Sequence, residues 1–510
     1  MAKRFHSVLR SSGLRLPKEI ADPIIERISS DSRSIKNGTQ TLFLGLPGEN
    51  TDGGFFWPQA ISSGAVAAVI SQNAAEKFPP LSNDLVFVLP DPPERWIGEI
   101  ASAFWGKPST HLDLIGVTGT NGKTTITHLI EHLSKSVGKP SAVFGTLVNR
   151  WPNYSETAIH TTTFADTLQA NLAKALEAGA RIGAMEVSSH ALVQQRVAGC
   201  QFAGAIFTNL TQDHLDYHSS MDDYFEAKSL LFSSPLLSPK SSKPIINIDD
   251  NWGLKLSKRL GGNCWRCSLG GDVEGEVELF FSELSMSSFG VKGTLHSPFG
   301  SGLFKSPLLG EFNLMNLLQS VGALLQEGLP LDDLLNSISD FPGVPGRMQL
   351  INILDSEYSS SLPTVLVDYA HTPDALKNTL LSLRPLTKGK LICLFGCGGD
   401  RDRGKRSQMG EVASMFSDKL VITSDNPRSE NPSEIINDIL QGIKFNVDTT
   451  IQSDRSKAIE LAIFDAGEDD LVLIAGKGHE DYQLIGDSKF HFDDGEQATN
   501  SLHLKLNSLL

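Results

Sequence analysis

Cysteine is scarce in this chain, with five residues in 510. So small and odd a number of thiols fits a reducing compartment and excludes a small disulfide-stapled scaffold. Cys264 and Cys267 have C-x-x-C spacing, but a turn-like Gly-Gly-Asn precedes them and no second pair of metal ligands lies near them in the sequence. We therefore interpret them as free thiols on the surface or in a hairpin; the alternatives are a zinc site or a redox site.

Long apolar runs and an excess of basic residues are also missing. No run approaches the roughly 18 apolar residues that cross a bilayer, and no long apolar stretch follows the basic residues 1–6, so we expect neither a membrane span nor a secretory signal. The net charge of −15 argues against nucleic acid or a membrane surface as a partner. We expect a cytoplasmic monomer that acts on small molecules.

What is present is ordinary for a globular enzyme: 40% of the residues are hydrophobic and 20% are charged. At roughly 150 residues per domain, the length suggests about three domains. The pattern changes near residue 105, and two prolines and two glycines interrupt the chain at residues 341–347. We therefore predict domains at residues 1–105, 106–341 and 342–510.

Apolar strand-like runs alternate with loops in the first domain and with helical segments in the other two. Such alternation implies right-handed crossovers and mainly parallel sheets. We expect an α/β protein with a smaller N-terminal α/β domain, a central mononucleotide-binding domain with a phosphate loop, and a Rossmann-like C-terminal domain. The predicted strands are residues 41–45, 65–70, 85–89, 112–117, 141–144, 182–185, 204–208, 365–368, 391–395, 419–423 and 471–475, the predicted helices include 96–105 and 124–136, and 260–305 are expected to form antiparallel hairpins.

The strongest single motif is G-V-T-G-T-N-G-K-T-T at residues 116–125, between a predicted strand and a predicted helix. Backbone N–H groups at such a helix N-terminus bind phosphate, Lys123 would neutralise β/γ oxygens, and Thr124 would hold Mg²⁺. Val117 stands where the strict motif has its first glycine, so the alternative is a glycine-rich turn that binds nothing. We predict an ATP site. Its loop residues are Gly119, Thr120, Asn121, Gly122, Lys123, Thr124 and Thr125.

Two further strands end in polar segments. Glu186 closes the strand before V-S-S-H, and His214 lies in the polar segment 208–218 that follows the next strand. The carboxyl ends of parallel strands face the ligand crevice, and hard divalent cations take carboxylate and imidazole ligands. We predict that Glu186 and His214 share a metal; the alternative is that His214 is structural.

Together these motifs resemble the Mur ligase family, ATP-dependent amide-forming enzymes of peptidoglycan synthesis. The resemblance runs in the family's order from about residue 31 to residue 480. It implies three domains, one each for a nucleotide-sugar peptide, ATP and an incoming amino acid, and within the family it is to enzymes that extend UDP-N-acetylmuramoyl-L-alanyl-D-glutamate by a diamino acid. The matching motifs are residues 118–125, 186–190, 209–216, 310–316, 345–347 and 368–371.

The resemblance implies that a substrate carboxylate attacks the γ-phosphate of ATP and that an amine then attacks the acyl phosphate. It also implies two Mg²⁺ ions, one at Thr124 and Glu186, and one at Glu186, His214 and a carbamylated Lys228. Without the resemblance, Lys228 would be one lysine on the solvated face of an amphipathic helix. Asn313 and Arg347 are implied to reach ATP, and the linker before Arg347 suggests that the third domain swings.

The implied contacts to the sugar peptide come from two domains. Thr163 stands where the family usually has proline, and Glu49 is an acid beside an anionic ligand. For Ser30 and Ser32 the alternative is a helix cap or turn. The implied residues are Ser30, Ser32, Glu49, Asn50, Thr51, His160, Thr161, Thr162, Ser188, Gln194 and Arg196.

The sequence D-N-P-R at residues 425–428 matches the motif of family members that add meso-2,6-diaminopimelate. Diaminopimelate has one carboxylate more than lysine, and arginine binds a carboxylate with two parallel hydrogen bonds. A lysine site would leave Arg428 unpaired beside an ammonium group; the alternative for Arg428 is a surface salt bridge. Glu480 is expected to pair with the ligand's amino group. The implied residues are Arg401, Asp425, Asn426, Pro427, Arg428, Gly476 and Glu480.

Two other functions compete with this one. A folylpolyglutamate synthetase shares the ATP-dependent fold and amide chemistry, but it has no use for residues 425–428 or for S-D-S-R at residues 30–33. A non-enzymatic nucleotide-binding regulator would use G-C-G-G at residues 396–399 as a dinucleotide site, but Arg401 occupies the position of the third glycine.

Overall fold

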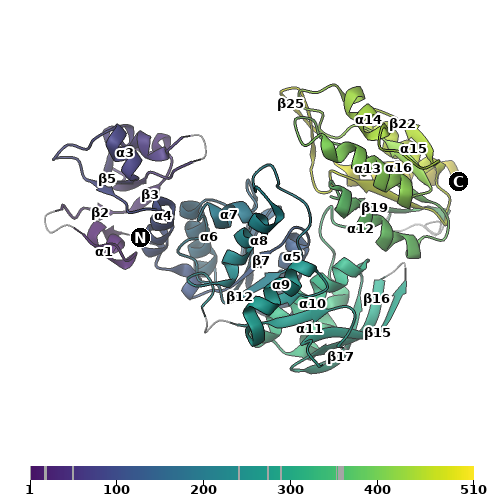
Figure 1. The fold of residues 1–510 in the computed structure, drawn as a ribbon, viewed down its shortest axis with the longest axis horizontal. Helices are drawn as coiled ribbons and strands as arrows, with labels where there is room; N and C mark the ends of the chain where they lie inside the picture. Colours follow the sequence, from purple (N-terminus) through teal and green to yellow (C-terminus); the bar gives the residue numbers. More distant parts are fainter. Residues whose placement is uncertain are drawn as a thin grey trace.

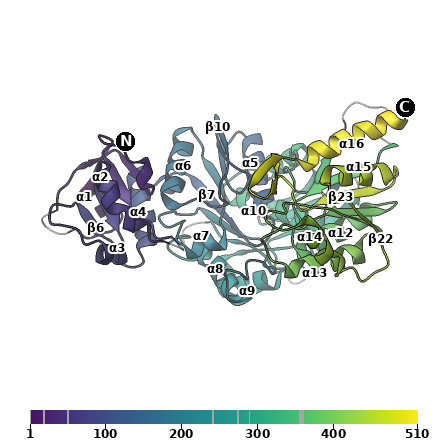
Figure 2. The same cartoon turned by 90° about the horizontal axis from the view of Figure 1, so that it is seen from above.

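The computed structural model describes residues 2–16, 20–48, 51–238, 242–272, 275–287, 290–351, 353 and 361–509. Three units follow one another along the longest axis, with the N-terminal unit at one end and the C-terminal unit at the other (Figure 1; Figure 2). Each unit contains a sheet with helices packed on it. No helix in the described part of the chain is long and apolar enough to cross a membrane.

The N-terminal unit has a parallel four-stranded sheet of order β3-β4-β5-β6. Helices α1 and α4 cover one face, and α2 and α3 cover the other. A short antiparallel pair, β1–β2, brings residues 3–4 beside residues 24–25. The bounds are β1 Lys3–Arg4, α1 Phe5–Ser11, β2 Ile24–Ile25, β3 Arg27–Ser29, β4 Thr41–Leu44, α2 Trp57–Ser62, β5 Ala65–Ile70, α3 Gln72–Lys77, β6 Val86–Val88 and α4 Pro93–Trp105.

The central unit is built on an 11-stranded sheet among the described residues, of order β10-β9-β8-β11-β7-β12-β13-β14-β15-β16-β17. Counted in that spatial order, the strands from β8 through β15 run parallel to one another. Antiparallel hairpins form the two edges of the sheet. Helices α5, α10 and α11 cover one face and α6 to α9 the other. The bounds are β7 Asp113–Thr118, α5 Lys123–Ser136, β8 Ser141–Phe144, β9 Val148–Trp151, β10 Tyr154–Thr157, α6 Ala165–Glu177, β11 Ile182–Glu186, α7 Ser189–Val193, β12 Gly204–Phe207, α8 Met221–Ser229, β13 Ile245–Asn247, α9 Asn251–Leu260, β14 Trp265–Ser268, β15 Leu279–Ser287, β16 Gly290–Ser297, β17 Gly300–Ser306, α10 Glu311–Gln326 and α11 Leu331–Ser337.

The C-terminal unit has a six-stranded sheet, β18-β19-β23-β20-β21-β22, in which only β18 runs antiparallel among the described strands. Helices α12 to α14 pack on one face, and α15 and α16 on the other. A separate hairpin, β24–β25, precedes the last helix. The bounds are β18 Gln349–Ile351, β19 Thr364–Asp368, α12 Pro373–Leu383, β20 Leu391–Phe395, α13 Gly404–Phe416, β21 Lys419–Ile422, α14 Pro432–Leu440, β22 Asp448–Ile451, α15 Arg455–Asp465, β23 Leu471–Ala475, β24 Tyr482–Ile485, β25 Ser488–His491 and α16 Asp494–Leu509.

The predicted three-unit α/β fold is confirmed, and two local predictions are wrong. The segment at β14 is not part of a hairpin: the α9 crossover makes β14 a parallel strand between β13 and β15. For the same reason Cys264 and Cys267 are not surface thiols but are buried in the interior. The domain boundaries at residues 105 and 341 stay predictions, and both lie between the strands of successive sheets.

Candidate active site

The phosphate loop joins β7 to α5, as the motif predicts. A Cβ atom at Gly122 would collide with the side-chain oxygen of Asn316, and Gly122 has φ +90°, so only glycine fits this position. Among the side chains that the structure describes, none caps the N-terminus of α5. Its first backbone N–H groups therefore remain available to an anion.

Two lysines converge on the same carbonyl of this loop. Lys123 Nζ and Lys228 Nζ both donate to the Gly119 oxygen, at 2.9 and 2.8 Å. Lys228, from α8, is buried, so the alternative that it lies on a solvated helix face is wrong. Burial, together with the positive charge of Lys123, lowers the pKa of the Lys228 ammonium well below its ordinary value.

A cavity of about 490 Å³ lies in front of the loop, between the central and C-terminal units. It brings together most of the predicted ATP and metal residues. Lys228 is not among the lining residues and contacts the loop through the Gly119 carbonyl. The predicted residues that line the cavity are Thr120, Asn121, Gly122, Lys123, Thr124, Thr125, Thr161, Glu186, His214, Asn313 and Arg347.

Glu186 is fixed at the end of β11 by the neighbouring loop after β8. Thr146 donates its backbone N–H to Oε1 at 2.8 Å and its hydroxyl to Oε2 at 2.9 Å. A Cβ atom at Gly145 would collide with Oε1. Glu186 is 1% exposed and lines the cavity, so its carboxylate is a preformed oxygen ligand, and it makes no ion pair among the described residues.

His214 also lines the cavity, in a left-handed backbone conformation with φ +54°. Burial lowers the pKa of its imidazole, which favours the neutral form that can donate a lone pair to a metal. Its ring packs edge-on against that of His190, with centroids 4.9 Å apart.

The C-terminal unit contributes Arg347 and Asp368 to the same cavity. The Arg347 guanidinium lies 4.2 Å from the centre of the Tyr369 ring. The buried Asp368 carboxylate accepts the backbone N–H of Met348 at 2.8 Å, which fixes the chain beside Arg347. Burial raises the pKa of Asp368.

Five of the six predicted sugar-peptide residues of the central unit lie in one connected group. The Thr162 hydroxyl accepts the Ser188 N–H at 3.1 Å, and Arg196 donates to the Thr162 carbonyl at 2.9 Å. Arg196 also donates to Gln194 at 2.8 Å. The Thr146 hydroxyl lies 3.1 Å from the Thr161 hydroxyl. Because Thr146 also donates to the Glu186 carboxylate, it connects this group to Glu186.

The predicted residues of the N-terminal unit are less closely gathered. The Ser30 hydroxyl donates to Asp166 of α6 at 2.6 Å, so Ser30 ties the first unit to the second. Ser32 is buried in a short 3₁₀ turn capped by Asp31, and Thr51 is exposed. His160, in the central unit, is also exposed and packs edge-on against Phe164. The predictions for Glu49 and Asn50 lie outside the described residues.

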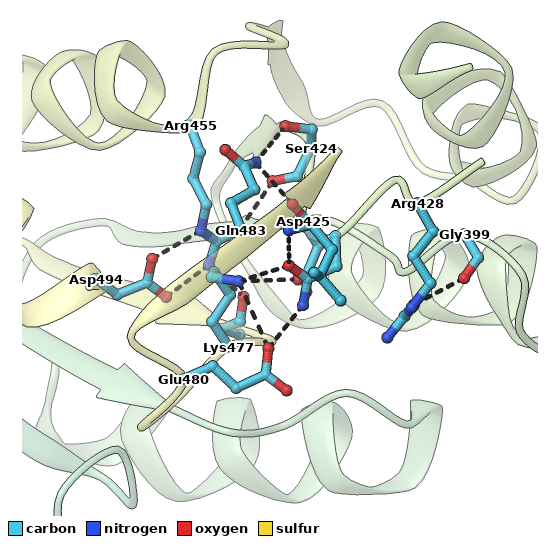
Figure 3. Close-up of polar contacts among 12 residues, drawn as sticks. Gly399, Ser424, Asp425, Arg428, Arg455, Lys477, Glu480, Gln483 and Asp494 are labelled. Atoms are coloured by element: carbon cyan, nitrogen blue, oxygen red, sulfur yellow. Dashed lines mark hydrogen bonds and ion pairs between the residues drawn. The ribbon is translucent and has the colours of Figure 1, made fainter. Parts of the chain in front are cut away.

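In the C-terminal unit, the D-N-P-R segment follows β21 and lies against the loop after β23 (Figure 3). The Asn426 side chain donates to Glu480 at 2.7 Å. Arg428, half-buried with φ +53°, donates to the Gly399 carbonyl at 2.7 Å, so it is not a surface salt bridge. Pro427 and Gly476 are buried, and Arg401 is exposed on the loop after β20.

Sequence reasoning missed the residue that holds the two acids of this site together. The fully buried Lys477 ammonium lies 3.5 Å from both Asp425 and Glu480 and donates to Asn426 at 3.2 Å (Figure 3). Burial, then the Asp425 charge, raise the pKa of Glu480 despite this lysine. The signal was present, since Lys477 lies inside the G-K-G-H-E motif, but the motif alone does not say which side chains turn inward.

The hairpin β24–β25 was missed as well. Gln483 donates to the Asp425 carbonyl at 2.7 Å (Figure 3). The Leu484 N–H donates to the Asn426 side chain at 2.9 Å. Arg428 pairs with this hairpin through its own N–H and the Leu484 carbonyl. The D-N-P-R motif by itself does not predict that a hairpin more than 50 residues later in the chain will pack against it.

Each of the three units matches a model of a known protein family. Family models match residues 24–105 (Mur ligase family, catalytic domain), 117–324 (Mur ligase middle domain) and 346–478 (Mur ligase, glutamate ligase domain). The chain is 58% identical over 508 residues to the UDP-N-acetylmuramoyl-L-alanyl-D-glutamate–2,6-diaminopimelate ligase of Prochlorococcus marinus strain MIT 9313, covering 99% of this chain and 100% of that one.

Solved structures agree. A structure of a UDP-N-acetylmuramoyl-L-alanyl-D-glutamate–2,6-diaminopimelate ligase superposes with a TM-score of 0.70 at 33% identity, over 99% of this chain and 100% of the other. The MurF ligase of Thermotoga maritima in complex with ADP shares the fold, with a TM-score of 0.62 at 16% identity over 95% and 98% of the two chains. With all three units matched in order and a relative of this identity across its whole length, the chain belongs to the Mur ligase family.

Proposed function

We propose that this protein is an ATP-dependent ligase that adds meso-2,6-diaminopimelate to UDP-N-acetylmuramoyl-L-alanyl-D-glutamate in the cytoplasm, acting as a monomer. The observation that carries the proposal is that one chain holds both a phosphate loop and a C-terminal site containing Arg428 and Glu480. Relatives matched over their full length bear the name of that ligase. The three units would then bind the sugar peptide, ATP and the amino acid in chain order.

ATP is proposed to bind in the 490 Å³ cavity. The uncapped N-terminus of α5 and Lys123 would meet the β- and γ-phosphates. Asn313 and Arg347 approach from the other walls, and Arg347 comes from the C-terminal unit. Because two units complete the cavity, a swing of the third domain would govern access of ATP to it.

The donor set fits Mg²⁺. The Thr124 hydroxyl and the Glu186 carboxylate line one cavity, and both are hard oxygen ligands. No cluster of three or more His, Cys, Asp or Glu side chains is preformed in the described part of the chain. A site with so few protein ligands suits Mg²⁺, because the ion keeps several water ligands and binds through one or two carboxylates plus substrate phosphates. When bound, the ion would neutralise charge on the transferring phosphoryl group.

Lys228 is proposed to be carbamylated and to join Glu186 and His214 at a second metal. Burial and the neighbouring Lys123 lower the pKa of Lys228, which favours the neutral amine, the form that adds to carbon dioxide. The product is a carbamate anion, which carries oxygen ligands in place of a cation that repels metals. In its amine form Lys228 donates to Gly119, so the modified side chain would have to leave that carbonyl.

The sugar peptide is proposed to lie along the group Thr161, Thr162, Ser188 and Arg196, which adjoins the Glu186 end of the cavity. A carboxylate of the peptide would then stand beside the γ-phosphate. Its oxygen attacks phosphorus, ADP leaves, and the acyl phosphate forms. The amine of diaminopimelate next attacks the carbonyl carbon, phosphate leaves, and one proton is released. The chain's contribution is to position these groups and offset their charge.

Diaminopimelate is a double zwitterion, and the proposed site has both signs. Arg428 would bind the carboxylate that lysine lacks, with Arg401 on the facing loop, and Glu480 would accept the ammonium. Arg428→Ala tests this: kcat/KM for diaminopimelate should fall at least tenfold, because a charged hydrogen bond contributes about 1.5–3 kcal/mol. Full activity of the variant with diaminopimelate would reject the assignment. A folylpolyglutamate synthetase would instead release phosphate with folate substrates.

A further inference from the structure

Two neighbouring loops of the C-terminal unit each carry one of the arginines that the proposed function assigns to diaminopimelate. Arg401 lies in the loop of residues 396–403, after β20, and Arg428 lies in the loop of residues 425–430, after β21. Strands β20 and β21 are parallel neighbours, so their following loops meet at the same edge of the sheet. We call these two segments the arginine loops.

Each arginine loop contains a non-glycine residue in the left-handed region. Asp400 and Arg428 both have φ +53°. Such conformations cost free energy and persist only where surrounding contacts fix them. The contacts that fix these two residues therefore also fix where the guanidinium groups of Arg401 and Arg428 can reach.

Asp400 is fixed by the opposite loop. Its carboxylate accepts the Ser429 hydroxyl at 2.7 Å and the Ser429 N–H at 3.1 Å. The Gly399 N–H donates to the Asn426 carbonyl at 2.9 Å, and Arg428 donates to the Gly399 carbonyl. A Cβ atom at Gly399 would collide with the Pro427 carbonyl, which shows how closely the backbones approach.

Glu430 also holds the two loops together. Its Oε1 accepts the Asp400 N–H at 2.6 Å and Arg406 at 2.8 Å, and its Oε2 accepts Arg406 at 3.0 Å and Arg403 at 2.9 Å. Arg406 is fully buried and also donates to the Gly398 carbonyl at 3.2 Å. One carboxylate thus joins the second loop to the backbone of the first.

These donors keep Glu430 charged. The Arg406 guanidinium, then the Asp400 N–H, hold the pKa of Glu430 at about 2. The buried Arg406 keeps a second acid, Asp438, at 2.9 Å. Loss of the Glu430 charge would therefore release the loops without leaving Arg406 wholly unpaired.

We propose that Glu430, held by Arg406, is a positioning residue that sets the separation of Arg401 and Arg428 and so determines the preference for a second carboxylate on the amino acid. It rests on the proposed function, since it concerns how that amino-acid site is held. Glu430 does not touch the ligand. Its removal should loosen binding of diaminopimelate while leaving ATP binding and the chemical step intact.

The test is steady-state kinetics of Glu430→Gln in the full-length protein. The amide keeps the size of the side chain and loses the charge. KM for diaminopimelate should rise at least tenfold, while kcat and KM for ATP stay within twofold, and the ratio of kcat/KM for diaminopimelate to that for lysine should fall. Glu411→Gln is the matched control, because it makes the same change on α13 in an ion pair with Lys444 at 2.7 Å, and it should leave all constants within twofold.

A KM for diaminopimelate within twofold of wild type in Glu430→Gln would overturn the proposal, as would an equal rise in the KM values of all three substrates. Ser429→Ala provides a second test if Glu430→Gln does not fold: KM for diaminopimelate should rise about threefold, and Ser429→Thr should restore it. No change in Ser429→Ala would also overturn the proposal. If Arg428→Ala itself leaves diaminopimelate addition unchanged, the proposed function fails instead.

Discussion

Replacing Asp494 by Asn should destabilise the C-terminal unit strongly. Asp494 accepts both Nε and Nη2 of Arg455 at 2.7 Å, and neither side chain is exposed to solvent (Figure 3). Arg455 also donates to the carbonyls of Ser424 and Ala475, the residues just before Asp425 and Gly476. The pair therefore stabilises the strand ends on which the amino-acid site is built.

The magnitude follows from burial. Removing one partner of a buried ion pair leaves an uncompensated charge and costs about 3–5 kcal/mol. In a unit of this size, one kcal/mol changes the melting temperature by about 2–4 °C, so the transition of this unit should fall by about 6–20 °C. The amide oxygen of Asn can keep one hydrogen bond to Arg455, which places the expected effect toward the lower end.

Differential scanning calorimetry of the full-length protein measures the shift, with Asp448→Asn as the matched control. The exposed Asp448 makes an ion pair with Lys419 at 3.5 Å, and ion pairs at the surface contribute about 0–1 kcal/mol. The double variant Asp494→Leu with Arg455→Met should recover part of the loss, because it removes the buried charge altogether. A shift in Asp494→Asn no larger than that in Asp448→Asn would refute the reasoning.

Three further predictions concern the active site. Gly145→Ala should lower kcat and raise the Mg²⁺ concentration for half-maximal activity about tenfold, since its Cβ displaces the Glu186 carboxylate; an unchanged Mg²⁺ titration would contradict the role of Glu186. With ¹³C-labelled bicarbonate, the protein should show a carbamate resonance that Lys228→Ala lacks, and identical spectra would exclude the modification. Because burial and Asp425 raise the pKa of Glu480, kcat/KM for diaminopimelate should fall, as pH is lowered, at a higher pH than for an ordinary glutamate. Glu480→Gln should remove that limb of the pH profile, and a profile with the same limb would assign it to another group.

Features that depend on chain-local pattern were predictable from the sequence. The phosphate loop needs glycine at fixed offsets from a strand and a helix, and Glu186 follows its strand directly, so both can be placed without a structure. The parallel strands of the central and C-terminal units could be predicted for the same reason, because buried parallel strands are short apolar runs.

Features that depend on contacts between distant segments could not be predicted. Thr146 holds Glu186 from 40 residues away, and the hairpin at Gln483 holds Asp425 from 58 residues away. Lys228 lies on a helix whose pattern suits a solvated face, and only its approach to Gly119 explains its burial. Similarly, the C-x-x-C spacing does not reveal that β14 lies between β13 and β15, where Cys267 is buried in the core.

The central claim is that one chain couples ATP cleavage to joining diaminopimelate with a nucleotide-sugar dipeptide. Phosphate release from ATP by the purified protein, with Mg²⁺, tests it most directly. We predict phosphate release only when UDP-N-acetylmuramoyl-L-alanyl-D-glutamate and meso-2,6-diaminopimelate are both present, and far less when lysine replaces diaminopimelate. Equal release with lysine would contradict the amino-acid assignment, and release that does not depend on the sugar dipeptide would contradict the claim itself.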